Sequence, residues 1–208
     1  MQVAFTVLLV GVLVGAVISF VVMGMMQLRR TNSLATRAHA MNMHFSPVDP
    51  FNVPRRYGAF ALIRGGHGQR AHNVTHGHLA GWPVRAFDFH YEVAHATRRA
   101  ARHYGVVVVE TDMDLPDVLM WHEDDADGPP LAARAARVRA GAWSCTGDVA
   151  FARRLMRVCE PLADDPVSIE TRRAAIMFCS PVRKSRSDYD QPLERIGQAL
   201  VELKNFSE

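Results

Sequence analysis

The chain has 208 residues, a formal net charge of +3 and 49% hydrophobic residues. This mild charge argues against a nucleic-acid-binding protein, whose domains usually carry a concentrated basic face and a recognition motif. The three cysteines, Cys145, Cys159 and Cys179, are odd in number and form no C-x-x-C pair, so we expect reduced, buried thiols rather than a disulfide framework.

An apolar run without a charged side chain covers residues 3–26, and Arg29 and Arg30 follow it. As a helix rising about 1.5 Å per residue, the run is long enough to cross a hydrocarbon core of about 30 Å. The sequence therefore predicts a transmembrane anchor over residues 1–28, with Arg29 and Arg30 at the membrane interface and the lipid bilayer as a partner.

The charges around this run predict its orientation. Two uncharged residues precede it, whereas Arg29, Arg30 and Arg37 follow it, and the positive-inside tendency keeps such arginines in the cytoplasm. A cleaved signal peptide is the alternative, but the run lacks a basic leading region and a small-x-small cleavage site. We expect a single-pass bacterial inner-membrane protein with its N-terminus outside and its C-terminal domain in the cytoplasm.

Gly11 and Gly15 form a G-x-x-x-G step within the predicted anchor. Such a step permits close approach of two helices in lipid. It predicts a possible homodimer through the transmembrane helix, although glycine steps of this kind are also common in spans that do not associate.

Residues 29–45 are predicted as a juxtamembrane helix or linker, which either continues the anchor or restarts near residues 31–33. Leu34, Ala38 and Met41 form a short apolar stripe at helical spacing. The prolines and turn residues of segment 46–50 disfavour helix, so the remaining residues, 46–208, are expected to form one domain.

The first half of this domain shows strand patterns. Residues 60–63 form a short apolar run, and segments 70–78 and 82–93 flank a hairpin turn at residues 79–81. Within segment 82–93, large apolar residues alternate with Ala86, Asp88, His90 and Glu92, which predicts one face in the core and one facing water. The valine-rich segment 103–110 predicts a central strand buried on both faces.

The second half mixes strands and helices. We expect a turn at residues 115–117, strands over 118–122, 137–143 and 174–179, a helix capped by Asp148, and an amphipathic final helix containing Leu193, Ile196, Leu200 and Leu203. These elements together predict an α+β domain in which helices pack on one side of an antiparallel sheet.

Several short motifs resemble a family of uncharacterised bacterial proteins with an N-terminal membrane anchor. The motifs are His44-Phe45-Ser46-Pro47 with Asp49-Pro50, Arg70-Ala71-His72-Asn73-Val74 with Gly77 and Gly81, and Val84-Arg85-Ala86-Phe87-Asp88-Phe89-His90-Tyr91. The resemblance covers about residues 43–116 and implies a single-pass anchored fold. The family has no assigned activity, so the resemblance implies no catalytic residue.

Histidines are concentrated in the predicted hairpin. On a regular strand His72, His76 and His78 point the same way, with His90 on the neighbouring strand, and together they could hold zinc. Against this site, Arg85 is expected beside His76 as a repelling cation, and no H-E-x-x-H motif is present. The alternative is a set of exposed strand histidines and no cofactor.

A nucleophile is suggested only by Cys145, which follows Ser144 on a predicted loop, and nothing in the sequence supplies a histidine partner for it. Three functions therefore remain open. The first is a membrane-tethered, non-enzymatic interaction or scaffolding domain with an unknown protein partner. The second is a metal-dependent hydrolase using the histidines, and the third is a pH- or envelope-stress-responsive sensor.

Overall fold

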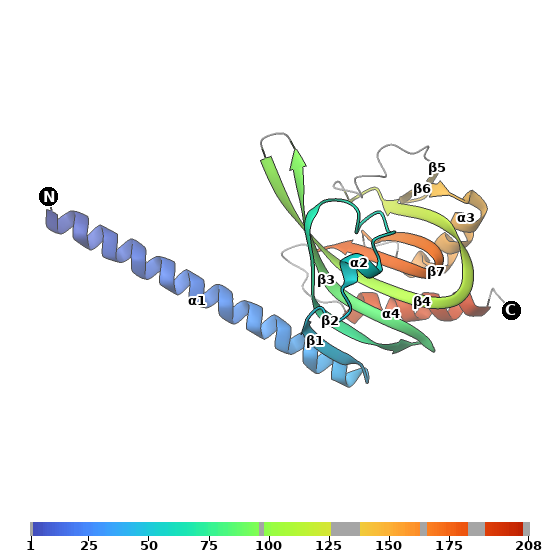
Figure 1. Cartoon of the computed structure of the whole chain (residues 1–208), viewed down its shortest axis with the longest axis horizontal. Helices are drawn as coiled ribbons and strands as arrows, with labels where there is room; N and C mark the ends of the chain where they lie inside the picture. The colour runs from blue at the N-terminus through green and yellow to red at the C-terminus, as the bar shows by residue number, and fades with distance from the viewer. Residues whose placement is uncertain (1, 96–97, 126–137, 163–165, 183–189, 206–208) are drawn as a thin grey trace.

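The computed structural model describes residues 2–95, 98–125, 138–162, 166–182 and 190–205. Its helices are α1 (Gln2–Ala40), α2 (Val53–Arg56), α3 (Val149–Val158), the 3-10 helix η2 (Glu160–Leu162) and α4 (Asp190–Asn205). Its strands are β1 (His44–Val48), β2 (His67–Leu79), β3 (Trp82–His95), β4 (Arg98–His122), β5 (Val138–Ala140), β6 (Trp143–Gly147) and β7 (Ser168–Pro181). The described part is therefore α+β (Figure 1).

All seven described strands belong to one antiparallel sheet, in which β4 is the central strand. One edge of β4 pairs with β7 from Tyr104 to Met120. The other edge pairs first with β3, up to Val109, and then with β6, from Val118. Because β4 changes partner along its length, it bends between these two positions, and its register with β7 shifts there.

Both faces of the sheet are covered. One face, together with α3, α4 and the end of α1, forms a core that includes Val107, Leu155 and Leu200. The other face packs against α2 and the turn that follows it, in a core that includes Phe89 and Val108. The prediction of an antiparallel sheet is confirmed, but the prediction of helices on one side is incomplete because α2 lies on the second face.

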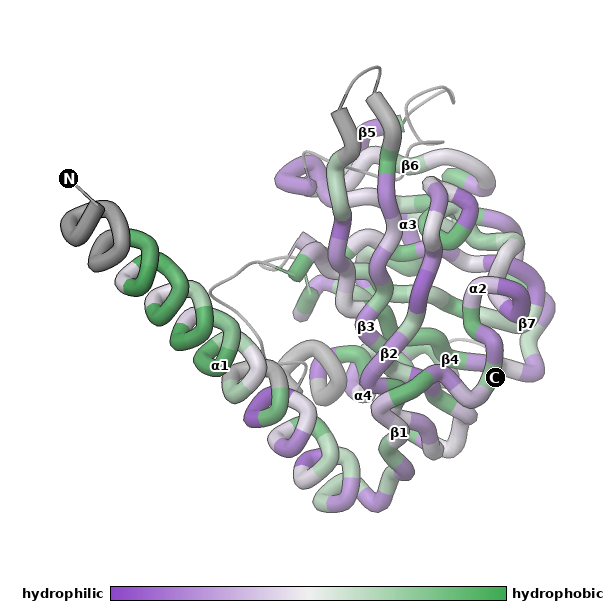
Figure 2. Tube along the Cα trace, turned by 60° about the vertical axis from the view of Figure 1, so that its left-hand side comes forward, coloured by the Kyte–Doolittle hydropathy of each residue, from purple (hydrophilic) through white to green (hydrophobic). Residues whose placement is uncertain are grey.

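Helix α1 runs without interruption from the apolar segment into the domain (Figure 1). From Leu9 onward it is long and apolar enough to cross a membrane by length and composition, and none of its most apolar window is buried in the protein. Figure 2 shows this apolar part extending away from the sheet. The helix does not break at residues 31–33, and Leu34 and Ala38 are buried as the predicted stripe requires.

The predicted hairpin is confirmed. Strands β2 and β3 pair up to Leu79 and Trp82, and the two turn residues, Ala80 and Gly81, both have positive φ, at 52° and 87°. Two positive φ angles are the pattern of the type I′ turn, whose twist matches that of the flanking strands.

Three local predictions are wrong. Residues 60–63 form a buried turn rather than a strand, since the Arg64 amide bonds back to the Phe60 carbonyl and the Ala61 amide donates to Glu170. Residues 115–117 lie within the bent strand β4 rather than in a turn between two strands. The predicted strand over 137–143 is interrupted: Val138–Ala140 form β5 and Trp143 begins β6, because Gly141 takes a positive φ of 62° and turns the chain. Residue 137 lies outside the described residues.

Candidate functional site

A buried carboxylate joins α1 to the sheet. Asp88 on β3 has only 5% of its side chain exposed, and its Oδ1 accepts a 2.9 Å ion-pair bond from Nη2 of Arg30. Its Oδ2 accepts a 2.8 Å bond from the Asn73 amide, and Nε2 of His72 lies 3.6 Å from the same oxygen. Thr31 on α1 donates to the Asn73 side chain at 3.4 Å. We call these five residues the Asp88 cluster.

A bulge in β2 explains how these side chains meet. Along β2, His72 pairs with Asp88 but Thr75 pairs with Ala86, so β2 contains one extra residue between them. Asn73 lies in this bulge with φ of 51°, a conformation that asparagine tolerates better than most residues. The bulge directs both His72 and Asn73 toward Asp88.

The same bulge separates the histidines named from the sequence. His72 pairs with Asp88 and His76 pairs with Arg85, and two β3 residues that are three positions apart point to opposite faces. His90 shares the face of Asp88, while His78 shares the face of His76. His72 and His90 therefore lie on one face, and His76 and His78 lie on the other, contrary to the expectation of a single face.

Each histidine group has its own neighbours. The rings of His90 and His103 are 4.6 Å apart on the Asp88 face. On the other face His76 stacks on His44 at 5.2 Å and meets Phe51 edge-on at 4.9 Å. Among the described residues, no group of three or more His, Cys, Asp or Glu side chains is arranged to hold a metal ion. The zinc hypothesis therefore has no preformed ligand set in the described part of the chain.

Burial and nearby basic groups lower the pKa values of His72, His76 and His103. Burial lowers the pKa of His72, and Arg30 and His90 lower it further, against the opposing effect of the Asp88 carboxylate. Partial burial and His90 likewise lower the pKa of His103. Burial, His44 and the predicted neighbour Arg85 lower the pKa of His76.

A second carboxylate organises the opposite face. Oε1 of Glu110 on β4 accepts bonds from Nη2 of Arg56 and Oη of Tyr57, both at 2.9 Å, and Nη1 of Arg85 lies 2.7 Å away. Burial raises the pKa of Glu110, but these donors outweigh it and the net pKa is lowered. The four residues, the Glu110 cluster, hold α2 against the sheet, and a pocket of about 770 Å³ lies beside them.

The described cysteines are buried thiols, as expected. Burial raises the pKa of Cys145 and raises that of Cys159 to about 12, so neither forms a thiolate readily near neutral pH. Ser144 and Cys145 lie on strand β6 rather than on a loop, which is a correction to the predicted nucleophile position. A buried thiol on a paired strand is poorly placed to attack a substrate.

The sequence did not predict that Asp88 is a site residue. Asp88 is expected on the water-facing side of its strand, yet it is buried together with Ala86 because helices cover that face, with Arg30 of α1 bonded to Asp88 itself. Arg30 was assigned to the membrane interface, and no pattern in the sequence links it to a residue 58 positions away. The positive φ of Asn73 also leaves no signal in the sequence beyond the residue type itself.

Comparison with known proteins finds a similar solved structure but no matching sequence family. No protein-family model matches the sequence, and no curated protein does. The structure is similar to the crystal structure of the mycobacterial trehalose monomycolate transport factor A, TtfA, with a TM-score of 0.57 and 14% sequence identity over 82% of this chain and 94% of that chain. At this identity the similarity shows the fold alone.

Proposed function

We propose that this chain is a non-enzymatic, membrane-anchored accessory protein whose domain is held in a fixed orientation at the cytoplasmic face of the inner membrane. There it binds a protein partner in the same membrane. This proposal includes the N-outside topology and the similarity to uncharacterised anchored bacterial proteins that the sequence suggests.

The main support for this proposal is that the apolar helix continues directly into the domain and contacts the sheet. From Leu9 to Leu28 the helix rises about 30 Å, the thickness of a hydrocarbon core. Arg30, two residues beyond, pairs with the buried Asp88. A domain fastened at this point has no flexible linker and therefore little freedom to rotate about the anchor, which suits a protein that presents one surface to a neighbour in the membrane.

Two further observations support a binding role over a catalytic one. The described thiols are buried, and the Asp88 and Glu110 carboxylates are used in packing α1 and α2 onto the sheet. The structural neighbour is named as a transport factor, which suggests a membrane transport protein as the class of partner to test.

A flexible insertion tests the proposal. A Gly/Ser linker of about 12 residues between Leu28 and Arg29 keeps the anchor and the Asp88 cluster but releases the domain from its fixed orientation. A photo-crosslinking amino acid at the exposed position Val48 forms a covalent bond to a bound partner, and the yield of this cross-link is the measurement. We expect the linker to leave carbonate-resistant membrane association unchanged and to reduce the wild-type cross-link strongly.

The matched control carries the same Gly/Ser segment after Glu208, where it leaves the anchor untouched. This control should cross-link as the wild type does. Equal cross-linking by the inserted variant would refute the fixed-orientation proposal. Recovery of the chain in the soluble fraction without its leading segment, or a C-terminal reporter fusion active only in the periplasm, would refute the anchor or its orientation.

A second candidate function is acid-responsive sensing, and one contact favours it. His72 lies 3.6 Å from Asp88, so protonation of His72 would add a charge that competes with Arg30 for the same carboxylate. Loosening of α1 from the sheet would then be the signal. Reduced protection of α1 residues 30–40 from hydrogen exchange at pH 5.5, relative to pH 7.5, is the expected readout.

We also propose that two copies associate through Gly11 and Gly15. Within the described residues, and apart from the helix's own backbone and the two adjacent residues, no atom lies within 4 Å of where a Cβ at either glycine would sit, so this helix surface is open. Replacing both glycines by leucine should abolish association in a membrane two-hybrid assay, since bulkier side chains hold the backbones apart. Unchanged association would remove this claim.

A further inference from the structure

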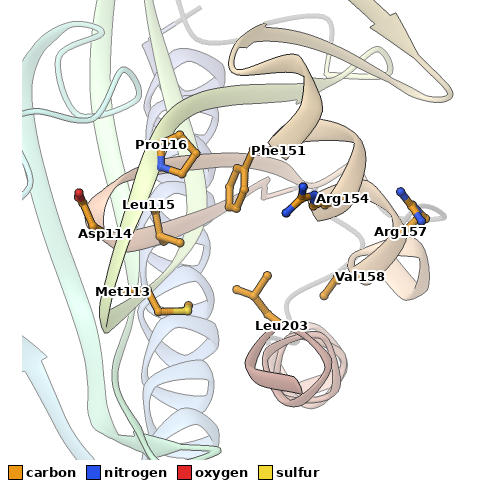
Figure 3. A pocket seen from close by; sticks show the side chains of 9 residues that line it. All are labelled: Met113, Asp114, Leu115, Pro116, Phe151, Arg154, Arg157, Val158 and Leu203. Carbon is orange, nitrogen blue, oxygen red and sulfur yellow. The ribbon is translucent and has the colours of Figure 1, made fainter. Parts of the chain in front are cut away.

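An apolar pocket of about 500 Å³ lies on the sheet face that carries α3 and α4 (Figure 3). Its apolar lining comes from three elements that are distant in the sequence: Met113, Leu115 and Pro116 of β4, Phe151 and Val158 of α3, and Leu203 of α4. The volume falls within the range of about 300–1,000 Å³ typical of small-molecule sites. The pocket contains none of the residues of the Asp88 or Glu110 clusters.

The β4 residues that line the pocket lie where the strand changes partner. Pairing with β3 ends at Val109 and pairing with β6 begins at Val118, so the lining segment lies between the two paired regions. The register with β7 shifts over the same segment. Met113, Leu115 and Pro116 therefore line the pocket from the part of β4 that is paired with neither β3 nor β6.

One end of the pocket is cationic, and the acidic lining residue, Asp114 of β4, lies at the opposite end with its carboxylate directed away from the arginines (Figure 3). Arg154 and Arg157 of α3 line it, three residues apart and therefore on neighbouring positions of the helix surface. Figure 3 shows both side chains beyond Phe151, on the side away from β4. Both are exposed, and neither guanidinium has a hydrogen bond or ion pair with any residue that the structure describes. Like charges at this spacing repel each other, so an anion placed between them would be attracted by both.

We infer that this pocket binds a long-chain fatty acid, with its carboxylate on Arg154 and Arg157 and its alkyl chain among Leu115, Phe151 and Leu203. The charge complementarity selects an anionic head, and the apolar lining selects a hydrocarbon tail. A planar carboxylate also suits the fork of donors on a guanidinium. A protein partner is a poorer fit because stable protein interfaces bury about 800 Å² on each side, a broad surface rather than one hollow of this volume.

Photo-crosslinking tests the assignment directly. The full chain is placed in nanodiscs of zwitterionic lipid, labelled with a diazirine analogue of palmitate, and digested for mass spectrometry. We expect label on peptides that contain residues 113–116 or 151–158. Unlabelled palmitate should compete, whereas hexadecanol, which has the same chain without the charge, should compete far less.

The helix supplies its own matched control. The double variant Arg154→Gln/Arg157→Gln should lose labelling by at least about tenfold, because each charge-assisted hydrogen bond is worth roughly a factor of ten or more. Arg153→Gln, an exposed arginine on the same helix that does not line the pocket, should label as the wild type does. Met113→Trp, which fills the pocket, should also lose labelling while the circular dichroism spectrum stays native.

Several outcomes would overturn the inference. These are an absence of label on the pocket peptides, equal labelling of the double variant and the Arg153→Gln control, and equal competition by hexadecanol. Competition by lysophosphatidic acid but not by palmitate would show that the anion is a phosphate, and would also reject a fatty acid as the occupant.

Discussion

The Asp88 cluster and the Glu110 cluster lie on opposite faces of one sheet, and each centres on a carboxylate that pairs with arginine. Asp88 has 5% of its side chain exposed, and a single arginine, Arg30, joins it to α1. Glu110 has 26% of its side chain exposed, and two arginines and a tyrosine contact the same oxygen. The first cluster is buried and depends on one cation, whereas the second is more solvated and has several donors.

This difference predicts different sensitivity to mutation. A buried ion pair leaves an unpaired charge when one partner is removed, and that loss is costly. A partly exposed carboxylate with several donors loses less, since water and the remaining donors compensate. Substitutions in the Asp88 cluster should therefore lower the free energy of unfolding more than substitutions in the Glu110 cluster, although the Asp88 cluster is the more buried of the two.

Asp88→Ala should give the largest effect. We expect a loss of about 2–3 kcal/mol in the free energy of unfolding, less than the roughly 3–5 kcal/mol for a fully buried pair because Arg30 keeps 31% of its side chain exposed. Denaturant unfolding measures the loss, and proteolysis between α1 and the sheet should accelerate. The control is Asp117→Ala, which removes an exposed partner of Arg172 and should cost less than about 1 kcal/mol. Equal losses would erase the contrast between buried and exposed carboxylates.

Asn73 separates the backbone contribution from the hydrogen-bond contribution in the same cluster. Asn73→Gly removes the bond to Asp88 but tolerates the positive φ, so we expect a loss of about 1 kcal/mol. Asn73→Ala also forces alanine into the left-handed region, so the loss should rise to about 2 kcal/mol. Urea denaturation of the two variants gives the difference. An alanine variant as stable as the glycine variant would show that the bulge relaxes to ordinary strand geometry.

Glu110→Gln should have a smaller effect, about 0.5–1 kcal/mol, because the Gln oxygen still accepts from Tyr57 and Arg56 is well exposed. Arg85, the less exposed of the two arginines at 14%, keeps its hydrogen bond to Oη of Tyr57. The folded-state pKa of Glu110 is lowered, so its carboxylate stabilises the fold above the unfolded pKa of about 4.3, and this contribution is lost as pH falls through the folded value. Thermal melts of the variant should therefore fall less steeply between pH 4.5 and 3 than those of the wild type. A loss equal to that of Asp88→Ala would contradict the assignment of multiple donors.

Sequence patterns predicted the elements whose signals are local. The hairpin connection at residues 79–81, the Asp148 cap and the buried valine strand follow from short-range rules. The Asp148 side chain accepts from the Phe151 amide at 2.8 Å. The type I′ geometry of the turn was not predicted, because an alanine at Ala80 gives no signal for a φ of 52°. The Asp88 cluster could not be predicted from short-range rules, because it depends on a bulge at Asn73 and on a contact between residues 30 and 88, which are far apart in the sequence. A bulge reverses the face on which every later residue of the strand lies. The extra residue between His72 and Thr75, which the sequence pattern did not reveal, therefore places His72 and His76 on opposite faces of the sheet.

The alternating pattern of β3 also did not predict which of its faces is exposed to water. Asp88 and Ala86 alternate correctly with the phenylalanines of β3, yet the side predicted to face water is covered by α1, α3 and α4. Period-2 alternation reports which residues share a face but not whether a helix from elsewhere in the chain covers it.

The smallest predicted effect is acid sensitivity of the Asp88 face. His72 and His103 have folded-state pKa values lowered chiefly by burial, so the folded state binds their protons less readily than the unfolded state does. Above the unfolded pKa of about 6.5 these two histidines leave the free energy of unfolding independent of pH. Below it the unfolded state binds their protons first, so the free energy of unfolding falls as the pH falls. Thermal melts between pH 7.5 and pH 5 should show this fall, and His72→Gln/His103→Gln should flatten it. His78→Gln, an exposed histidine on the opposite face, should leave the fall unchanged. A double variant that remains as acid-sensitive as the wild type would place the responsible groups outside this face.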